Sequence, residues 1–202
     1  MPNHCENIII IKGPEKSIKE IIKKYSRTAH EEFPKEKILS FEKILPTPKE
    51  LYECNKITGK KTDHSLKREK ETNEEHKKRL EKLKKKYGNS DWYWWRVNNW
   101  GTKWDTYNLL YFDQEKELLT FEYSTAWAPG DKILLELSKK IPDVEIEIEY
   151  FEPGCCFCGK SKFKAGETIE RFYTEDIDKI KEIYPQHFED EEEEKEKKIT
   201  KW

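Results

Sequence analysis

Aromatic and polar side chains are mixed in one short stretch between positions 92 and 105, and this stretch offers the clearest binding chemistry. Five of the seven tryptophans of the chain lie in these fourteen residues. A tryptophan ring is large and carries a single N–H donor, so a cluster needs either a deep core or a ligand to stack on. The cluster therefore predicts a binding surface, with a packed core as the alternative. The polar residues among the rings are Asn98, Asn99, Thr102, Lys103 and Asp105.

The side chains favour a nucleotide-like ligand. A base stacked on an aromatic ring gains roughly 1–3 kcal/mol, and we expect Trp100, Trp104 and Trp127 to line the pocket. Basic side chains would meet a phosphate and an asparagine would read polar edges. In the alternative interpretation, helical spacing places Trp92 beside Trp95 and Trp100 beside Trp104 in a core. The predicted ligand-binding residues are Arg96, Asn99, Trp100, Lys103, Trp104, Trp127 and Glu152.

Three cysteines lie within four residues, at Cys155, Cys156 and Cys158. Zinc sites usually use paired Cys-x2-Cys knuckles, and this compact pattern is not one. Cys5, Cys54 or a histidine would have to complete a metal site. We keep three interpretations open: buried inert thiols, a metal site and redox pairing. The sequence predicts no cofactor, and catalysis is left open with a preference against it, because no phosphate-binding loop or hydrolase motif is present.

Residues 56–88 hold 13 Lys/Arg and 6 Asp/Glu, a local balance of 13 − 6 = +7. We interpret residues 65–87 as an exposed, thinly amphipathic helix or hairpin. It is either a solvated helix or a surface for nucleic acid or an acidic partner, although its interspersed glutamates would weaken phosphate binding. The candidate contacts are Lys67, Arg68, Lys78, Arg79 and Lys82.

Composition limits the classes of protein to which the chain can belong. The chain of 202 residues is 40% charged but 13% aromatic, which predicts a compact aromatic core with charged appendages. The net charge of −2 gives no global attraction to nucleic acid or membrane. No apolar run approaches the roughly 20 residues that span a bilayer. We expect no signal peptide and a cytosolic protein with reduced thiols.

The periodicity of apolar residues predicts the elements that must position these side chains. The order predicts an α+β fold: a ferredoxin-like antiparallel sheet with helices on one face, extended by a C-terminal hairpin and helix. Residues 1–186 would form one domain with a charged helical insertion at about 56–90, and 187–202 a charged tail. The expected strands are 8–11, 38–45, 106–112, 118–125, 144–150 and a pair within 163–172. The expected helices are 18–25, one following Pro129, and 177–184 capped by Thr174.

Several motifs resemble the YubB-type ferredoxin-like domain family of phage and plasmid proteins, a domain of unknown function. The resemblance covers residues 1–158, and it departs at His4, where an aromatic residue is usual, in the basic insertion and in the cysteine cluster. It implies the fold and residence on a mobile element, and it implies no reaction. Its motifs are Met1-Pro2-Asn3-x-Cys5-Glu6-Asn7, Phe41-x-x-Ile44-x-Pro46-x-Pro48, Asn99-Trp100-Gly101-Thr102-Lys103-Trp104-Asp105, Thr125-Ala126-Trp127-x-Pro129 and Glu152-Pro153-Gly154.

These observations predict a non-catalytic binding protein of a phage or mobile element, in the host cytosol. It would interfere with a host process such as defence, by analogy with small accessory phage proteins. The expected partner is a nucleotide-like small molecule or a host protein. The alternatives are a nucleic-acid-binding module that uses the basic helix and a metal-dependent hydrolase.

Overall fold

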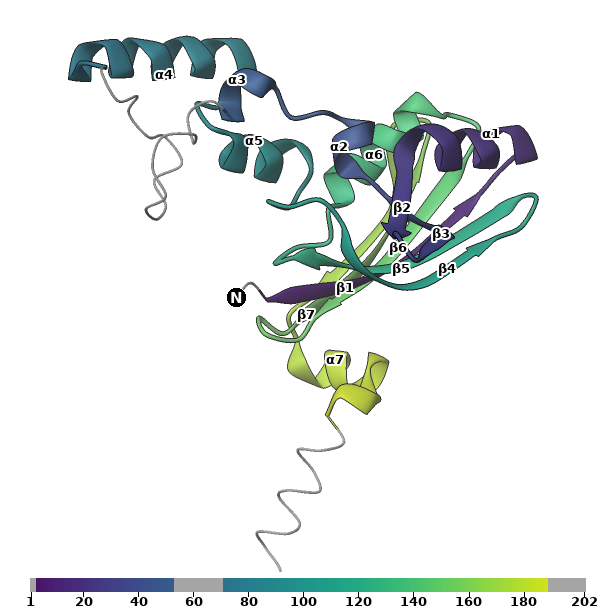
Figure 1. Ribbon diagram of the computed structural model, residues 1–202. Coiled ribbons are helices and arrows are strands. Elements are labelled where there is room, and N and C mark those ends of the chain that lie inside the picture. The colour runs from purple at the N-terminus through teal and green to yellow at the C-terminus, as the bar shows by residue number, and fades with distance from the viewer. Residues whose placement is uncertain (1–2, 53–70, 189–202) are drawn as a thin grey trace, which may run out of the picture.

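A six-stranded antiparallel sheet forms the centre of the computed structural model, which describes residues 3–52 and 71–188 (Figure 1). The strand order is β4-β5-β1-β6-β7-β8, so the N-terminal strand lies in the middle, between β5 and β6. The strands of this sheet are β1 His4–Lys12, β4 Tyr107–Gln114, β5 Leu118–Ala126, β6 Glu145–Glu152, β7 Phe157–Lys164 and β8 Glu167–Thr174.

The connectivity β1-α1-β4-β5-α6-β6 is that of a ferredoxin-like domain, and the predicted α+β class is confirmed. Helices α1 (Glu15–Glu20), α2 (Phe41–Ile44) and α6 (Asp131–Lys140) cover one face of the sheet (Figure 1). The β7–β8 hairpin widens the sheet beyond β6, as expected. Helix α7 (Ile177–Ile183) is the expected C-terminal helix, and it packs on the opposite face.

The position of α7 follows from the alternation along β6. Ile146, Ile148 and Tyr150 point into the main core, so Phe151 points to the other face. There Phe151 forms a small separate cluster with Cys158 and with Ile180 of α7. The short 3-10 helix Pro185–His187 follows, and Tyr184 stacks on Phe151 with ring centroids 4.9 Å apart. Asp176 rather than Thr174 caps α7, while the Thr174 hydroxyl accepts from the Asp176 amide.

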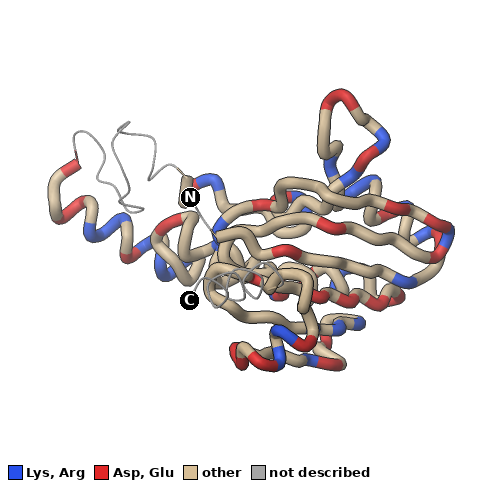
Figure 2. Tube along the Cα trace, turned by 90° about the horizontal axis from the view of Figure 1, so that it is seen from below, with Lys and Arg blue, Asp and Glu red and all other residues tan. Residues whose placement is uncertain are grey.

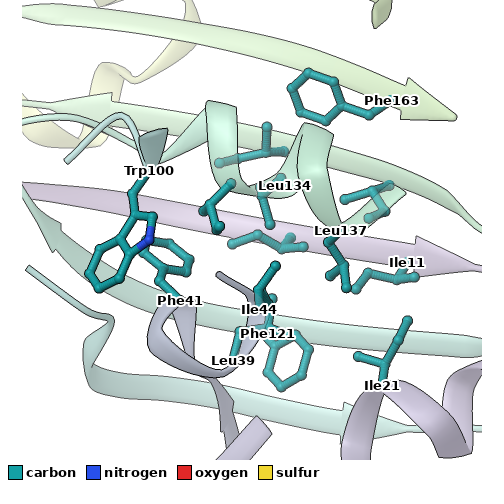
Figure 3. Close-up of a cluster of buried hydrophobic side chains, with 14 of the residues drawn as sticks. Ile11, Ile21, Leu39, Phe41, Ile44, Trp100, Phe121, Leu134, Leu137 and Phe163 are labelled. Atoms are coloured by element: carbon teal, nitrogen blue, oxygen red, sulfur yellow. The ribbon is translucent and has the colours of Figure 1, made fainter. Parts of the chain in front are cut away.

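The main core lies between the sheet and the helices on its first face. Ile9 and Ile11 of β1 are fully buried there, whereas Ile8 is 39% exposed on the other face. The four consecutive isoleucines are therefore not all buried. Burial alternates along β1, as in a strand whose one face packs on the core. Figure 3 shows Trp100 and Phe41 at one end of this core, beside Leu134 and Leu137 of α6.

A long insertion separates α1 from β4 and begins earlier than the sequence indicated. The π-helical turn Ile21–Tyr25 extends α1 and leads into a separate hairpin of β2 (Ser26–His30) and β3 (Phe33–Leu39). Residues 38–45 are not one strand, because Ser40 caps α2 by accepting from the Lys43 amide. Helix α3 (Lys49–Tyr52), helix α4 (Asn73–Tyr87) and helix α5 (Trp92–Asn99) complete the insertion.

Helix α4 confirms the predicted exposed basic helix over the part of it that is described. Thr72 and Glu75 form a capping box at its start, and Gly88 ends it in a left-handed conformation. Leu83 is buried and joins the main core, so α4 is anchored by a narrow apolar edge. None of the helices in the described part of the chain is long and apolar enough to cross a bilayer.

The second face of the sheet carries paired charges. Figure 2 views the sheet from below, with acidic and basic residues distributed along the strands. The glutamates of β6 are not simply solvated, because Lys160 and Lys162 of β7 lie opposite them. Lys160 Nζ lies 2.6 Å from Glu147 and 2.9 Å from Glu149, and Lys162 Nζ lies 3.3 Å from Glu147.

Candidate functional site

A cleft of about 370 Å³ lies between α5 and the loops that follow α5 and β5. Its size is at the lower end of the range for small-molecule sites. Two exposed tryptophans line it: Trp94 is 54% exposed and Trp127 is 44% exposed. The complete lining is Tyr93, Trp94, Val97, Gly101, Thr102, Lys103, Ala126, Trp127 and Ala128.

Helix α5 presents the first wall. Asp91 caps it, and the Asp91 carboxylate accepts from the Trp94 amide at 3.0 Å. The 3.6-residue period then places Tyr93, Trp94 and Val97 together on the cleft side. Trp95 turns into the core and is only 6% exposed. The same helix therefore supplies both core and cleft.

The second wall depends on an unusual backbone conformation at Trp127, whose φ is +71°. Left-handed backbone costs a side chain with a Cβ about 1–2 kcal/mol, so the surroundings must hold it. The Trp127 amide donates to the Asn3 carbonyl at 3.1 Å, and the Thr102 hydroxyl donates to the Ala126 carbonyl at 2.6 Å. Trp127 is thus presented by a fixed loop rather than by a regular strand.

Gly101 is needed where the cleft loop passes the start of α6. Its φ is +91°, and a Cβ on it would lie 3.1 Å from the Asp131 carboxylate and 3.2 Å from the Gly130 Cα. Gly130 itself has φ +75° as the N-cap of α6. Pro129 therefore precedes the cap, and the helix predicted to follow it begins at Asp131.

Lys103 supplies the positive charge of the cleft. Its ammonium lies 4.6 Å from the centroid of the Trp104 ring and 5.6 Å from that of Trp127. The attraction of a cation to an aromatic face holds the charge there without neutralising it. Within the residues that the structure describes, no carboxylate pairs with Lys103. The cleft therefore combines exposed indole faces with an available cation.

Two predicted ligand-binding residues lie inside the fold instead. Trp100 is fully buried, and its Nε1 donates to the Leu45 carbonyl at 2.9 Å. The Arg96 guanidinium lies 4.3 Å from the Trp100 ring centroid and binds Glu42 at 3.0 Å and Thr47 at 2.9 Å. Its side chain is only 12% exposed, so it has no free donor fork for a phosphate. Both residues are corrected to structural roles.

Asn99 and Glu152 are also absent from the cleft. The Asn99 amide donates to the Trp95 carbonyl at 2.8 Å, which ends α5 locally. Asn98 donates to Asn89. The Glu152 carboxylate is fully buried and accepts from the amides of Gly154, at 3.1 Å, and Cys155. Glu152 therefore stabilises the turn between β6 and β7.

The described cysteines differ in how far they are buried. Cys155 is exposed, Cys156 is partly buried, and Cys5 and Cys158 are buried. Bonding to the Glu152 carboxylate raises the pKa of the Cys155 thiol, and burial raises the pKa of the Cys5 and Cys158 thiols. Raised pKa values disfavour the thiolate that nucleophilic or metal chemistry needs. Residues 3–52 and 71–188 contain no group of three His, Cys, Asp or Glu side chains placed to hold a metal ion. Cys54 lies outside the described residues.

Three of the five basic candidates, Lys78, Arg79 and Lys82, lie on α4 and do not line the cleft. Lys67 and Arg68 lie outside the described residues. On α4, Arg79 binds Glu71 at 2.7 Å and approaches His76, whereas Lys78 and Lys82 form no ion pair within the described part of the chain. Figure 2 shows basic residues recurring along α4.

Tyr93 and Trp94 are the two aromatic lining residues that were not predicted from the sequence as ligand-binding. The signal was present, because Trp95 and Trp92 at helical spacing predicted a buried side for this helix. The residues between them then had to face away from that side. Of the residues predicted for the pocket, Lys103 and Trp127 line the cleft. Trp104 does not line it, and its ring contacts the Lys103 ammonium instead.

The fold and this corner of the sheet define an α+β protein with a ferredoxin-like core. Residues 100–201 match the family described as the ferredoxin-like domain in Api92-like protein. The match spans half of the chain, which therefore belongs to this family. Among curated proteins, none matches the chain.

The fold is also similar to a solved structure, the crystal structure of a protein api92 from Yersinia pseudotuberculosis. The TM-score is 0.50, and the alignment covers 86% of this chain and 98% of that chain. The sequences are 10% identical, so the similarity shows the fold and nothing of the ligand.

Proposed function

We propose that this chain is a non-catalytic binding protein whose cleft takes a nucleotide-like ligand. The observation that carries the proposal is the combination of exposed Trp94 and Trp127 faces with the ammonium of Lys103, which forms no ion pair with any residue in the described part of the chain. An indole face stacks on any planar base, and an ammonium binds a phosphate as a point charge. A host protein that inserts a planar or acidic side chain is the alternative occupant.

Native mass spectrometry of gently purified protein is the first test. An added mass of a few hundred daltons with absorbance near 260 nm would support the proposal and identify the ligand. Titration with N-methylanthraniloyl-ATP then measures binding directly by fluorescence. If the protein carries no such mass and binds neither this probe nor a panel of nucleoside phosphates, the nucleotide proposal fails and a protein partner is sought by pull-down.

Substitutions in the cleft provide the matched comparison. We expect Trp94→Ala and Trp127→Ala each to weaken binding of the probe by about 5- to 150-fold, the equivalent of one lost stacking contact. Lys103→Met should weaken binding of the triphosphate more than that of the nucleoside. Phe33→Ala is the control, since Phe33 is 56% exposed on the β2–β3 hairpin and does not line the cleft. Unchanged affinity in both folded tryptophan variants would contradict the cleft as the site.

A second candidate, binding of nucleic acid by α4, is favoured by the charge on this helix. Residues 73–87 hold seven Lys/Arg and three Asp/Glu. Five of these lysines form no ion pair within the described part of the chain: Lys77, Lys78, Lys82, Lys84 and Lys85. Fluorescence anisotropy with a single-stranded DNA 20-mer tests this role. Affinity should fall steeply with salt, and Lys78→Gln with Lys82→Gln should flatten the slope of log affinity against log salt concentration by about 1.4, since each phosphate contact to a single strand contributes about 0.7. Salt-independent affinity would contradict it.

We further propose that the family resemblance extends to the YubB type, and that the protein is encoded by a phage or plasmid and acts in the host cytosol. The supporting observation is the quoted set of motifs, read by analogy. Interference with host defence is tested by the plating efficiency of a defence-sensitive phage on bacteria with and without the expressed chain. A rise that Trp127→Ala abolishes is expected, and no rise would contradict this role.

A further inference from the structure

The left-handed conformation of Trp127 is held in part by side chains that do not line the cleft. A tryptophan at φ +71° persists only where its surroundings determine the backbone more strongly than its own preference does. The residues on either side of it therefore decide where the indole of Trp127 lies.

Thr125 makes the bond that closes this loop. Its hydroxyl donates to the Ala128 carbonyl at 2.7 Å, across Trp127, and Thr125 is fully buried. Because this bond joins residues that lie before and after Trp127, it limits the backbone conformations that Trp127 can adopt. The hydroxyl also accepts from the Asn7 amide at 2.9 Å, so its own orientation is set by β1.

Asn7 is a buried amide in the central strand, 2% exposed. Its nitrogen also donates to the carbonyls of Cys5, at 2.8 Å, and Tyr123, at 3.1 Å. The amide nitrogen therefore faces three acceptors, two of them across the strands on β5. The amide nitrogen has two hydrogens to share among these three acceptors and cannot itself accept, so the Thr125 hydroxyl directs its own hydrogen to the Ala128 carbonyl.

We propose that Asn7 and Thr125 are positioning residues for the cleft: they hold Trp127 in its left-handed conformation and so set the distance between its indole and the α5 wall. The relevance to ligand binding rests on the proposed function, whereas the effect on Trp127 does not. The arrangement also explains why the quoted motifs around Asn7 and Thr125 meet at one corner of the sheet.

The test uses the full chain labelled with 5-fluorotryptophan and observed by 19F NMR. The Trp127 resonance is assigned as the one that Trp127→Phe removes. Thr125→Val deletes the hydroxyl and keeps the shape, and we expect it to shift or broaden the Trp127 resonance and to raise the dissociation constant of N-methylanthraniloyl-ATP about tenfold. Thr125→Ser keeps the hydroxyl, so it should restore both.

Thr106→Val is the matched control, because the Thr106 hydroxyl is also buried and donates to a carbonyl, that of Leu39. It should lower stability without moving the Trp127 resonance. If the valine variant at 125 does not fold, Thr125→Cys keeps the volume with a weaker donor and gives the same readout. An unmoved Trp127 resonance in the folded variant overturns the proposal. Failure of the wild-type protein to bind the probe instead overturns the proposed function and leaves the positioning result standing.

Discussion

Trp100 and Trp127 were both predicted from the sequence to line the pocket, but one is buried and the other is exposed. Trp100 is fully buried against Phe41, with ring centroids 6.0 Å apart, whereas Trp127 is 44% exposed. Trp100 also carries the Arg96 guanidinium on its face. Trp100 thus joins the insertion to the core, and Trp127 faces the cleft.

Alanine substitution should separate these roles. Trp100→Ala leaves a large cavity and an unpaired Leu45 carbonyl, so we expect it to lower the free energy of unfolding by about 3–5 kcal/mol. Trp127→Ala should change it by about 0.5 kcal/mol or less, as is usual at exposed positions. Urea denaturation followed by circular dichroism measures both. Similar losses in the two variants would contradict the assigned roles.

At the scale of the element, the β7–β8 hairpin ends in a two-residue loop, Ala165-Gly166, with φ +51° and +81°. Two left-handed residues define the hairpin turn that prefers Asn-Gly, because asparagine tolerates this conformation better than alanine. We expect Ala165→Asn to raise the free energy of unfolding by about 1 kcal/mol. Thermal denaturation measures the change. Ala165→Val places a branched Cβ in the same left-handed conformation, so it should lower the free energy of unfolding. A stabilising valine would contradict this account.

The charged ladder between β6 and β7 predicts a pH dependence. Hydrogen bonding to Lys160 lowers the pKa of Glu147 below its ordinary value of 4.5, and the same bond raises the pKa of Lys160. A lowered carboxyl pKa contributes stability above the unfolded value, and this is lost as pH falls through the folded value. The lysine contribution is lost only as pH rises above 10.5.

Glu147→Gln isolates this effect. The stability difference between wild type and variant should be constant from about pH 6 to pH 9 and should shrink as pH falls below about 4.5. Urea denaturation at several pH values measures the difference. A difference that persists unchanged at pH 3 would show that the ladder is not its source.

At the scale of the whole molecule, the residues that match the family are fewer than the residues that form the sheet. The match begins at residue 100, yet β1 pairs with both β5 and β6 in the middle of the sheet. A fragment of residues 100–202 would leave two strands without their shared neighbour and with exposed apolar faces. The N-terminal strand is therefore part of the same cooperative unit.

We expect the isolated 100–202 fragment to remain unfolded, and addition of a 1–99 fragment to restore structure. Dispersion of amide resonances in two-dimensional NMR, measured before and after mixing, distinguishes the two states. A well-dispersed spectrum from the 100–202 fragment alone would contradict the prediction and would make residues 1–99 an accessory unit.

The sequence by itself determined the central elements of the fold. Alternation along 144–150, the turn at Gly166 and the apolar stripe from Ile133 to Ile141 are local patterns, and local patterns follow from the period of a strand or helix. The second strand of the core was mistaken, because residues 38–45 are apolar enough for a strand but are interrupted by the Ser40 cap.

Only the tertiary structure decided which aromatic rings form the cleft. Burial depends on how α5 is rotated against the core and on where its neighbours lie, and neither is encoded in spacing alone. Trp100 and Arg96 are buried because α2 and α3 cover them. Trp94 is exposed because it lies about 100° around α5 from the buried Trp95 and so faces the cleft instead of the core. The left-handed Trp127 likewise depends on Asn7 and Thr125, which pairing between distant strands brings together.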